Sequence, residues 1–471
     1  MKMEKENIGQ KFSKAFRALG RWFAFFGEHF IKGDILTKLS FGILGLSNII
    51  RGQIIKGLLF LGIEAAYIFY MINTGIHSLG GLKDLGSRKQ GMVMDDKLGI
   101  FVMQKGDNSM LILLYGVVAM SITIAFIVFY RTALRSALSA QKVKEQGERP
   151  AGFLEEIKAY FDKDLHKTLM ALPVTGILLF TVLPLFFMIL IAFTNYDHDH
   201  QPPGNLFTWV GLLNFKTILF SGKTVSHTFW LILGWTFVWA VFATGLNYLF
   251  GILLALLINR KETKAKGLWR TLFVISIAVP QFVSLLVVRT MLNNSGAVNA
   301  LLHQLGLLAP GKYLPFLSDP TWARITVIIV NLWVGIPYTM LITTGILSNI
   351  PSDLYESAKV DGAKPVTIFF KITMPYVLFV TTPYLITQFI GNFNNFNVIY
   401  FLTGGGPDSL SYYQAGKTDL LVTWLYKLTT GQMKDYSFAS TIGILVFIIS
   451  AIFSLTTYRR TASYNREEDF Q

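Results

Sequence analysis

Long apolar stretches alternate with short polar segments along most of the chain. The stretches at 169–193 and 438–458 contain no charged residue, and both exceed the roughly 18 apolar residues that mark a membrane-spanning helix. The pattern predicts an all-α polytopic membrane protein with about eight spans. We place these spans at 57–76, 109–130, 169–193, 227–258, 271–293, 323–347, 376–401 and 438–458.

The segment before the first span is apolar in part but too short to cross a bilayer. Residues 35–50 are followed by Arg51 and Lys56, so we expect an interfacial or re-entrant segment. The basic residues before it form either an ordinary cytosolic tail or an amphipathic helix on the inner leaflet. The apolar side of that helix would carry Phe12, Phe16, Leu19, Trp22 and Phe23.

Charge is scarce, and its placement orients the spans. Only 15% of the residues are charged, against about a quarter in soluble domains. The net charge of +14 comes from basic residues concentrated at 131–168, at 260–270 and after the last span. The positive-inside rule makes that side cytoplasmic, together with both termini. The segments then expected outside are 77–108, 194–226, 294–322 and 402–437.

Several classes of function lack their residues in this sequence. The chain has no cysteine, which excludes disulfides and thiolate metal sites. Glu64 in the first span should face protein or water, but no series of buried acids suggests an ion-coupled transporter. The YDHDH segment at 196–200 makes no closed metal site, and SGKT at 221–224 lacks the earlier glycine of a P-loop. We expect no catalytic residue, metal, cofactor or nucleic-acid partner.

The loop at 349–375, on the cytoplasmic side between spans six and seven, predicts two short helices joined by a sharp turn. Asp353 and Glu356 form a capping-box-like pair at the start of the first helix. Gly362 suits a left-handed turn, and Pro365 suits the first position of the second helix. Pro375 is expected to stop that helix where span seven begins.

This loop resembles the EAA coupling loop of permease subunits in binding-protein-dependent ABC importers. The family pattern appears as Glu356-Ser357-Ala358 and Asp361-Gly362-Ala363, followed by Ile372 and Pro375, with serine replacing the middle alanine. In that family the first helix of the loop inserts into a cleft of a separate ATP-hydrolysing subunit. The resemblance implies that the residues coupling this chain to the ATPase are Glu356, Ser357, Ala358, Asp361, Gly362 and Ala363.

Span seven carries an unusual group of asparagines, in the sequence NFNNFN at 392–397. Carboxamides both donate and accept hydrogen bonds, which suits sugar hydroxyls, but they also join helices to each other inside membranes. The pattern leaves both readings open. On a continuous helix Asn392 and Asn395 would share a side, with Gln388 one turn before Asn392.

The NFNNF segment, followed by Gly405-Gly406-Pro407, and NLWVGIPY at 331–338 resemble maltose/maltodextrin permeases of the MalF type. The likeness covers about 169–465. The outer segment at 194–226 is too short for the folded outer domain that some members carry. In that family these motif positions line the transmembrane sugar site. The substrate-binding residues that the resemblance implies are Gly335, Tyr338, Gln388, Asn392 and Asn395.

These observations predict a permease subunit of an ATP-driven, binding-protein-dependent sugar importer in the bacterial inner membrane. Maltose or maltodextrin is the expected substrate. The alternatives are another oligosaccharide, of the galacto-oligosaccharide or raffinose type, and an ion-coupled secondary transporter. The resemblance implies four partners: a second permease subunit (MalG-like), a dimer of ATPase subunits (MalK-like), an extracellular sugar-binding protein and membrane lipid.

The expected organisation has four parts. These are an N-terminal cytoplasmic or interfacial segment (1–56), a pair of transmembrane helices (57–130), a cytoplasmic linker (131–168) and a core permease domain (169–465) that contains the 349–375 loop.

Overall fold

The computed structural model describes residues 20, 22, 24–95, 99–260 and 262–459. Phe12, Phe16, Leu19 and Phe23 of the predicted amphipathic segment lie outside the described residues. The chain divides into two compact units, which are described separately. The first comprises the residues up to Leu190 and His200–Trp209, and the second comprises Ile191–Asp199 and the residues from Val210.

The helical membrane-protein fold predicted from the sequence is confirmed. Seven helical runs among the described residues are long and apolar enough to cross a membrane, and a bent helix pair would make an eighth. The bent pair is α12 (Lys266–Ala278) and α13 (Gln281–Met291), which meet at 88° where we expected one straight span. Pro280 explains the break, because it has no N–H and disfavours helical backbone at the preceding Val279, whose ψ is 129°.

The first unit contains three helical runs of spanning length and one hairpin. The strands β1 and β2 pair as an antiparallel ribbon, a departure from the all-α expectation. The elements are α2 (Ile35–Leu39), α3 (Leu46–Ile50), α4 (Ile54–Tyr70), a π-helical turn (Met71–Gly75), α5 (Ile76–Gly81), β1 (Gly91–Asp95), β2 (Ile100–Gln104), α6 (Ser109–Glu145), α7 (Phe153–Phe161), α8 (Leu165–Ile177), a second π-helical turn (Leu178–Val182) and α9 (Leu183–Ile191).

Buried polar contacts hold the segment before the first span. The two short helices α2 and α3 are each far too short to cross a membrane. The Arg51 guanidinium lies 2.6 Å from the Asp34 carboxylate and donates to the Thr37 hydroxyl at 3.1 Å. Glu64 is 9% exposed and accepts a hydrogen bond from the Leu44 N–H at 2.8 Å. Glu64 therefore faces protein, as predicted.

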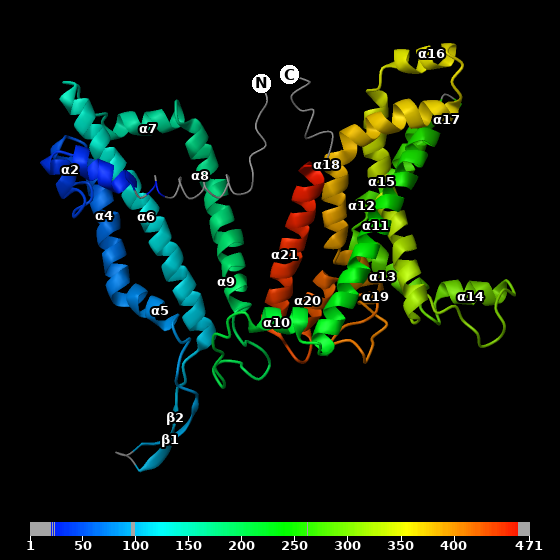
Figure 1. The fold of residues 1–471 in the computed structure, drawn as a ribbon, viewed down its shortest axis with the longest axis horizontal. Helices are drawn as coiled ribbons and strands as arrows, with labels where there is room; N and C mark the ends of the chain where they lie inside the picture. Colours follow the sequence, from blue (N-terminus) through cyan, green and yellow to red (C-terminus); the bar gives the residue numbers. More distant parts are fainter. Residues whose placement is uncertain (1–19, 21, 23, 96–98, 261, 460–471) are drawn as a thin grey trace. The chain divides into compact units, whose positions relative to one another are not determined.

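The second unit is a helical bundle, drawn from green to red in Figure 1. Its elements are α10 (Leu213–Phe220), α11 (Thr224–Asn259), α12, α13, α14 (Ala297–Gln304), α15 (Pro320–Ser348), α16 (Ser352–Val360), α17 (Pro365–Ile368), a π-helical turn (Phe369–Thr373), α18 (Met374–Phe393), α19 (Asn397–Thr403), α20 (Leu421–Thr430) and α21 (Tyr436–Arg459).

The helix α11 lies at the centre of this bundle, where it packs most extensively on α15 and also on α18. A side chain at Gly251 of α11 would overlap Thr339 of α15, so glycine lets the two helices approach closely. Apolar residues on the other faces of α11 pack against α20 and α21, with Trp424 and Phe229 almost fully buried. The helix α11 thus positions the elements that carry the predicted site residues.

Candidate functional site

The predicted turn of the 349–375 loop is present. The helix α16 ends at Val360, and Gly362 follows with a φ of 74°. The Ala363 N–H donates to the Ala358 carbonyl at 2.9 Å, and the Gly362 N–H donates to the Lys359 carbonyl at 3.0 Å. These two bonds form a Schellman motif, which satisfies carbonyls at the end of the helix. Pro365 is the first residue of α17, as predicted.

The start of α16 differs from the prediction. The helix begins at Ser352, with Pro351 at the capping position and no side-chain cap. Asp353 therefore lies inside the first turn, and the predicted capping box with Glu356 does not form. An acid in the first turn still interacts favourably with the positive end of the helix dipole.

Most of α16 is exposed. Tyr355 holds the helix to the bundle, because its hydroxyl lies 3.1 Å from the Thr373 hydroxyl and its ring packs in the cluster around Ile350 and Val377. Glu356 and Ser357 are exposed, and the apolar side chain of Val360 is 88% exposed. Leu354 of the same helix is also 47% exposed, so α16 presents apolar as well as charged side chains at its surface.

The second helix of the loop continues into span seven. We expected Pro375 to end that helix, and this was wrong: α17, the π-helical turn and α18 form one helical run from Pro365 to Phe393. Proline removes a backbone donor, and the wider π-helical turn just before Pro375 accommodates the disrupted bonding. Figure 1 shows α16 and α17 at the same end of the bundle, with α18 running away from that end.

The five predicted substrate residues do not all meet in one place: three share a small cavity, Tyr338 lines another, and Asn395 lines neither of these two cavities. Gly335, Gln388 and Asn392 line a cavity of about 10 Å³ between α11, α15 and α18, together with Thr244 and Asn247 of α11. Tyr338 is 53% exposed and lines a different cavity of about 290 Å³, at the break between α12 and α13. Trp333 and Gln281 share that larger cavity.

The asparagines of span seven have different partners. We predicted that Asn392 and Asn395 share a helical face. They do not, because the helix α18 ends at Phe393. The Asn395 amide still lies 3.5 Å from the Asn392 oxygen, and Asn395 accepts from the Val398 N–H at the start of α19. Asn394 donates back to the Ile390 carbonyl at 3.1 Å. Asn394 and Asn395 thus stabilise the break between α18 and α19.

Side chains of α11 fasten this break and the loop beyond it. The Trp239 indole donates to the Asn392 carbonyl at 2.9 Å, and the Asn392 amide donates to the Thr244 hydroxyl at 3.0 Å. Trp235, one turn earlier, donates to the Thr418 carbonyl at 3.2 Å. Asn392 therefore makes interhelical hydrogen bonds and lines the polar cavity at the same time.

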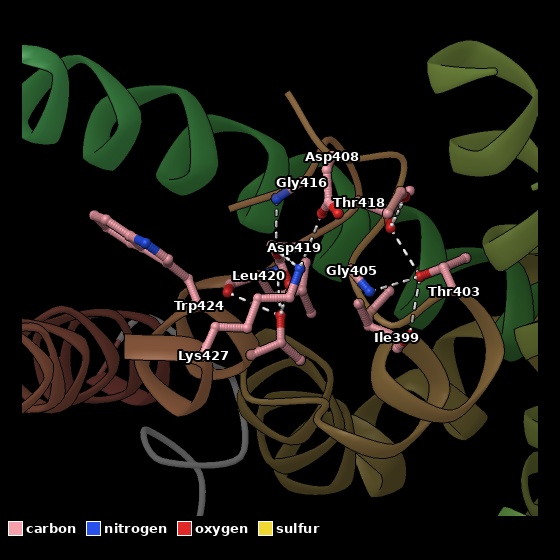
Figure 2. Close-up of polar contacts among 12 residues, drawn as sticks. Ile399, Thr403, Gly405, Asp408, Gly416, Thr418, Asp419, Leu420, Trp424 and Lys427 are labelled. Atoms are coloured by element: carbon pink, nitrogen blue, oxygen red, sulfur yellow. Dashed lines mark hydrogen bonds and ion pairs between the residues drawn. The ribbon is translucent and has the colours of Figure 1, made fainter. Parts of the chain in front are cut away.

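A buried carboxylate holds the glycine-rich loop that follows α19. Figure 2 shows Asp419 between Gly416 and Lys427, with the Gly416 N–H and the Lys427 ammonium both 2.7 Å from Oδ2. The Thr423 hydroxyl donates to Oδ1 at 2.8 Å. A Cβ at Gly405 would overlap this carboxylate. The loop therefore requires glycine at 405 and an acid at 419.

The surroundings of Asp419 have two opposing effects on the pKa of its carboxyl. Its side chain is fully buried, and burial raises the pKa of its carboxyl. The Lys427 ammonium and the Gly416 and Thr423 donors favour the charged form and oppose this rise in pKa. Because the Asp419 carboxylate accepts hydrogen bonds from three donors, it is satisfied although it is buried.

Sequence reasoning missed Asn247 and Thr244 of α11 and the Asp419–Lys427 pair. Asn247 carried a usable signal, because a carboxamide in an apolar span is as unusual as those of span seven. Asp419 lies in a loop, where an acid is ordinary, so the sequence held no such signal for its burial.

A multi-span helical chain with an exposed helix–turn–helix at one end of a span and a polar cavity between spans has the architecture of a membrane permease. Residues 247–461 match the family described as binding-protein-dependent transport system inner membrane component. The maltodextrin transport system permease protein MdxF of Bacillus subtilis is 35% identical over 429 residues, which cover 90% of this chain and 95% of that protein. The chain belongs to this family of ABC importer permeases, and its relatives are MalF-like.

Two further relatives differ in substrate and in length. The galactooligosaccharides transport system permease protein GanP of Bacillus subtilis is also 35% identical, over 90% of this chain and 96% of that protein. The maltose/maltodextrin permease MalF of Escherichia coli is 36% identical over 59% of this chain and 53% of that protein. A solved bacterial alginate ABC transporter matches the fold with a TM-score of 0.52 at 22% identity, over 65% of this chain and 95% of that chain.

Membership of the family fixes the general role of the chain. It is a multi-pass inner-membrane component of a binding-protein-dependent importer, and ATP is hydrolysed on a separate ATPase subunit. A periplasmic binding protein supplies the substrate, and the permease itself needs no cofactor. The expectation of a non-enzymatic transport subunit is thereby confirmed, and the family excludes the alternative of an ion-coupled secondary transporter.

Proposed function

We propose that the chain forms half of the translocation pathway of a maltodextrin importer and works by alternating access. The observation that carries this proposal is the single helical run from Pro365 to Phe393. One end of this run adjoins the exposed helix α16, and the other end reaches the polar cavity at Asn392. Movement imposed on α16 by an ATPase subunit is therefore delivered directly to the site.

The residues around the two cavities suit a neutral sugar. Gln388 and Asn392 of the smaller cavity, and Asn395 next to Asn392, offer carboxamides, which donate to and accept from hydroxyl groups. Tyr338 and Trp333 offer aromatic faces on which the apolar side of a sugar ring can pack, beside a cavity of about 290 Å³. The cavity at Gly335 is far too small for a sugar ring, so α11, α15 and α18 must separate during transport.

Maltodextrin is favoured over other oligosaccharides by the relatives. Besides MdxF, the maltodextrin permease MalC of Streptococcus pneumoniae is 34% identical over 90% of this chain. A galacto-oligosaccharide is the second candidate, because GanP matches equally well in identity. The same carboxamides and aromatic rings would serve either sugar.

Coupling and orientation complete the proposal. Glu356, Ser357 and Ala358 contact the ATPase, while Asp361, Gly362 and Ala363 set the turn that presents them. The basic bias of the loops supports a cytoplasmic position for α16 and both termini. A MalG-like second permease forms the other half of the pathway, and a pair of MalK-like subunits hydrolyses ATP. Residues 169–465 form the core permease domain.

Transport by the reconstituted importer tests this proposal. The chain is assembled in proteoliposomes with its second permease, its ATPase pair and its binding protein, and uptake of radiolabelled maltotriose is compared with that of a galacto-oligosaccharide. We expect ATP-dependent uptake of maltotriose, and its loss on deletion of 353–363 with membrane insertion intact. Uptake of the galacto-oligosaccharide alone would assign the other substrate. Normal uptake by the deletion variant would refute the coupling role.

A further inference from the structure

Several buried polar side chains of the described spans have an atom with no hydrogen-bond partner, and among them Asn247 lines the polar cavity between α11, α15 and α18. It lies within the apolar helix α11 and is 8% exposed. Its side-chain oxygen Oδ1 has no hydrogen-bond partner among the described residues. A buried carboxamide oxygen that has lost water and gained no donor is unfavourable. In this conformation no described residue donates a hydrogen bond to this acceptor.

The unpaired acceptor of Asn247 lies at the polar cavity between α11, α15 and α18. Asn247 lines the cavity of about 10 Å³ together with Gln388 and Asn392. That volume is close to the minimum for one water molecule. Each of these carboxamides comes from α11 or α18, and the third wall is the α15 backbone at Gly335. The acceptor of Asn247 thus lies at the place where the proposed sugar site is closed.

Gly335 explains how Asn247 is accommodated in the closed cavity. A Cβ at position 335 would overlap the Asn247 carboxamide, so only glycine lets that carboxamide lie against α15. We expected Gly335 to leave room for a sugar ring. In this conformation the Asn247 carboxamide occupies the space beside Gly335. When α11 and α15 separate, the same movement uncovers the α15 backbone and the Asn247 carboxamide.

We propose that Asn247 binds a hydroxyl group of the transported sugar when the cavity opens, and that it is a specificity-determining residue contributed by α11. This inference rests on the proposed function and adds a third helix to the site. A sugar hydroxyl donates the hydrogen bond that Oδ1 lacks in the closed conformation. The closed cavity is then disfavoured relative to the sugar-bound one, and binding and opening are linked.

The test measures the ratio of maltotriose transported to ATP hydrolysed in proteoliposomes that contain the complete importer. Asn247→Leu keeps the size of the side chain and removes the acceptor. We expect the ratio to fall about tenfold, as for the loss of one well-formed hydrogen bond, while ATP hydrolysis stimulated by the loaded binding protein continues. Asn247→Asp keeps an oxygen at the same place and should retain more of the ratio than Asn247→Leu.

A matched control separates binding from folding. Thr228 is also a buried polar residue of α11, and it accepts a hydrogen bond from the Tyr413 N–H at 2.9 Å. Thr228→Val should lower uptake and ATP hydrolysis in proportion and leave their ratio unchanged. The same proportional loss in Asn247→Leu, or no change at all, would overturn the proposal.

Failure of the proposal for Asn247 can be distinguished from failure of the proposed function. If the wild-type importer carries a galacto-oligosaccharide and not maltotriose, the ratio is measured with that sugar, and the prediction for Asn247 is the same. If Asn392→Leu lowers the ratio and Asn247→Leu does not, the proposed site stands and the role of Asn247 is refuted.

Discussion

Single residues in this chain fix the shape of loops that the helices alone would leave undetermined. Gly362 could be predicted from its sequence, because a glycine between a slim helix and a proline indicates a left-handed turn, and its φ of 74° agrees. The role of Asp353 could not be predicted, because several residues before the helix can serve as its cap. The contact of Asn247 with Gly335 joins two helices that are distant in the sequence. Asp419 has its partners Gly416, Thr423 and Lys427 nearby in the sequence, but an acid in a loop gives no sign that it is buried.

The Asp419 carboxylate is expected to stabilise the glycine-rich loop between α19 and α20. Asp419→Ala leaves the Gly416 and Thr423 donors and the Lys427 ammonium without their acceptor, and breaking a buried pair in this way costs about 3–5 kcal/mol. We expect a clear fall in the melting temperature of the purified protein in detergent.

Asp408 provides the control for this variant. It also lies near the Lys427 ammonium, at 3.7 Å, but its side chain is exposed. Asp408→Ala should change the melting temperature very little, because exposed ion pairs contribute about 0–1 kcal/mol. Equal melting temperatures for the two variants would contradict the role of Asp419.

At the scale of elements, the apolar stretches predicted the positions of the spans well. The predictions that failed concern helix breaks and helix ends near proline. Pro280 breaks the fifth span into two helices at 88°, whereas Pro375 breaks nothing, because a π-helical turn precedes it. The sequence pattern alone does not distinguish these outcomes, since each depends on which groups satisfy the freed backbone. The end of α18 at Phe393 was missed for a related reason, because Asn395 caps α19 only once the chain has turned.

The turn between α16 and α17 is expected to control coupling. Gly362→Ala forces a side chain into the left-handed region, with a strain of about 1–2 kcal/mol, and α16 relieves that strain by moving from its docking orientation. We expect binding of the ATPase subunit to weaken by about fivefold to thirtyfold, measured by titration of the purified subunit onto the permease.

Gly345 in α15 is the matched control, because no atom lies within 4 Å of a Cβ built there. Gly345→Ala should bind the ATPase subunit as the unchanged protein does. A Gly362→Ala variant that binds with unchanged affinity would show that the turn does not set the docking geometry.

For the whole molecule, the sequence predicted the class and the family, and both are confirmed. The apolar lengths, the loop motif and the span-seven motif each depend on nearby residues, which is why they could be recognised. The packing of α11 against α15 and α18 depends on residues distant in the sequence, 153 positions apart in the Trp239–Asn392 contact, and so it required the structure.

The central claim is that α16 docks on a separate ATP-hydrolysing subunit. The chain contains no cysteine, so a single introduced thiol reacts at one known position. In membranes that hold the complete importer, Val360→Cys at the exposed end of α16 is treated with a thiol-to-amine cross-linker, and Leu410→Cys in the loop after α19, also fully exposed, serves as the control. We predict a cross-link between Val360→Cys and the ATPase subunit and none from Leu410→Cys. A cross-link to that subunit from Leu410→Cys alone would contradict the account.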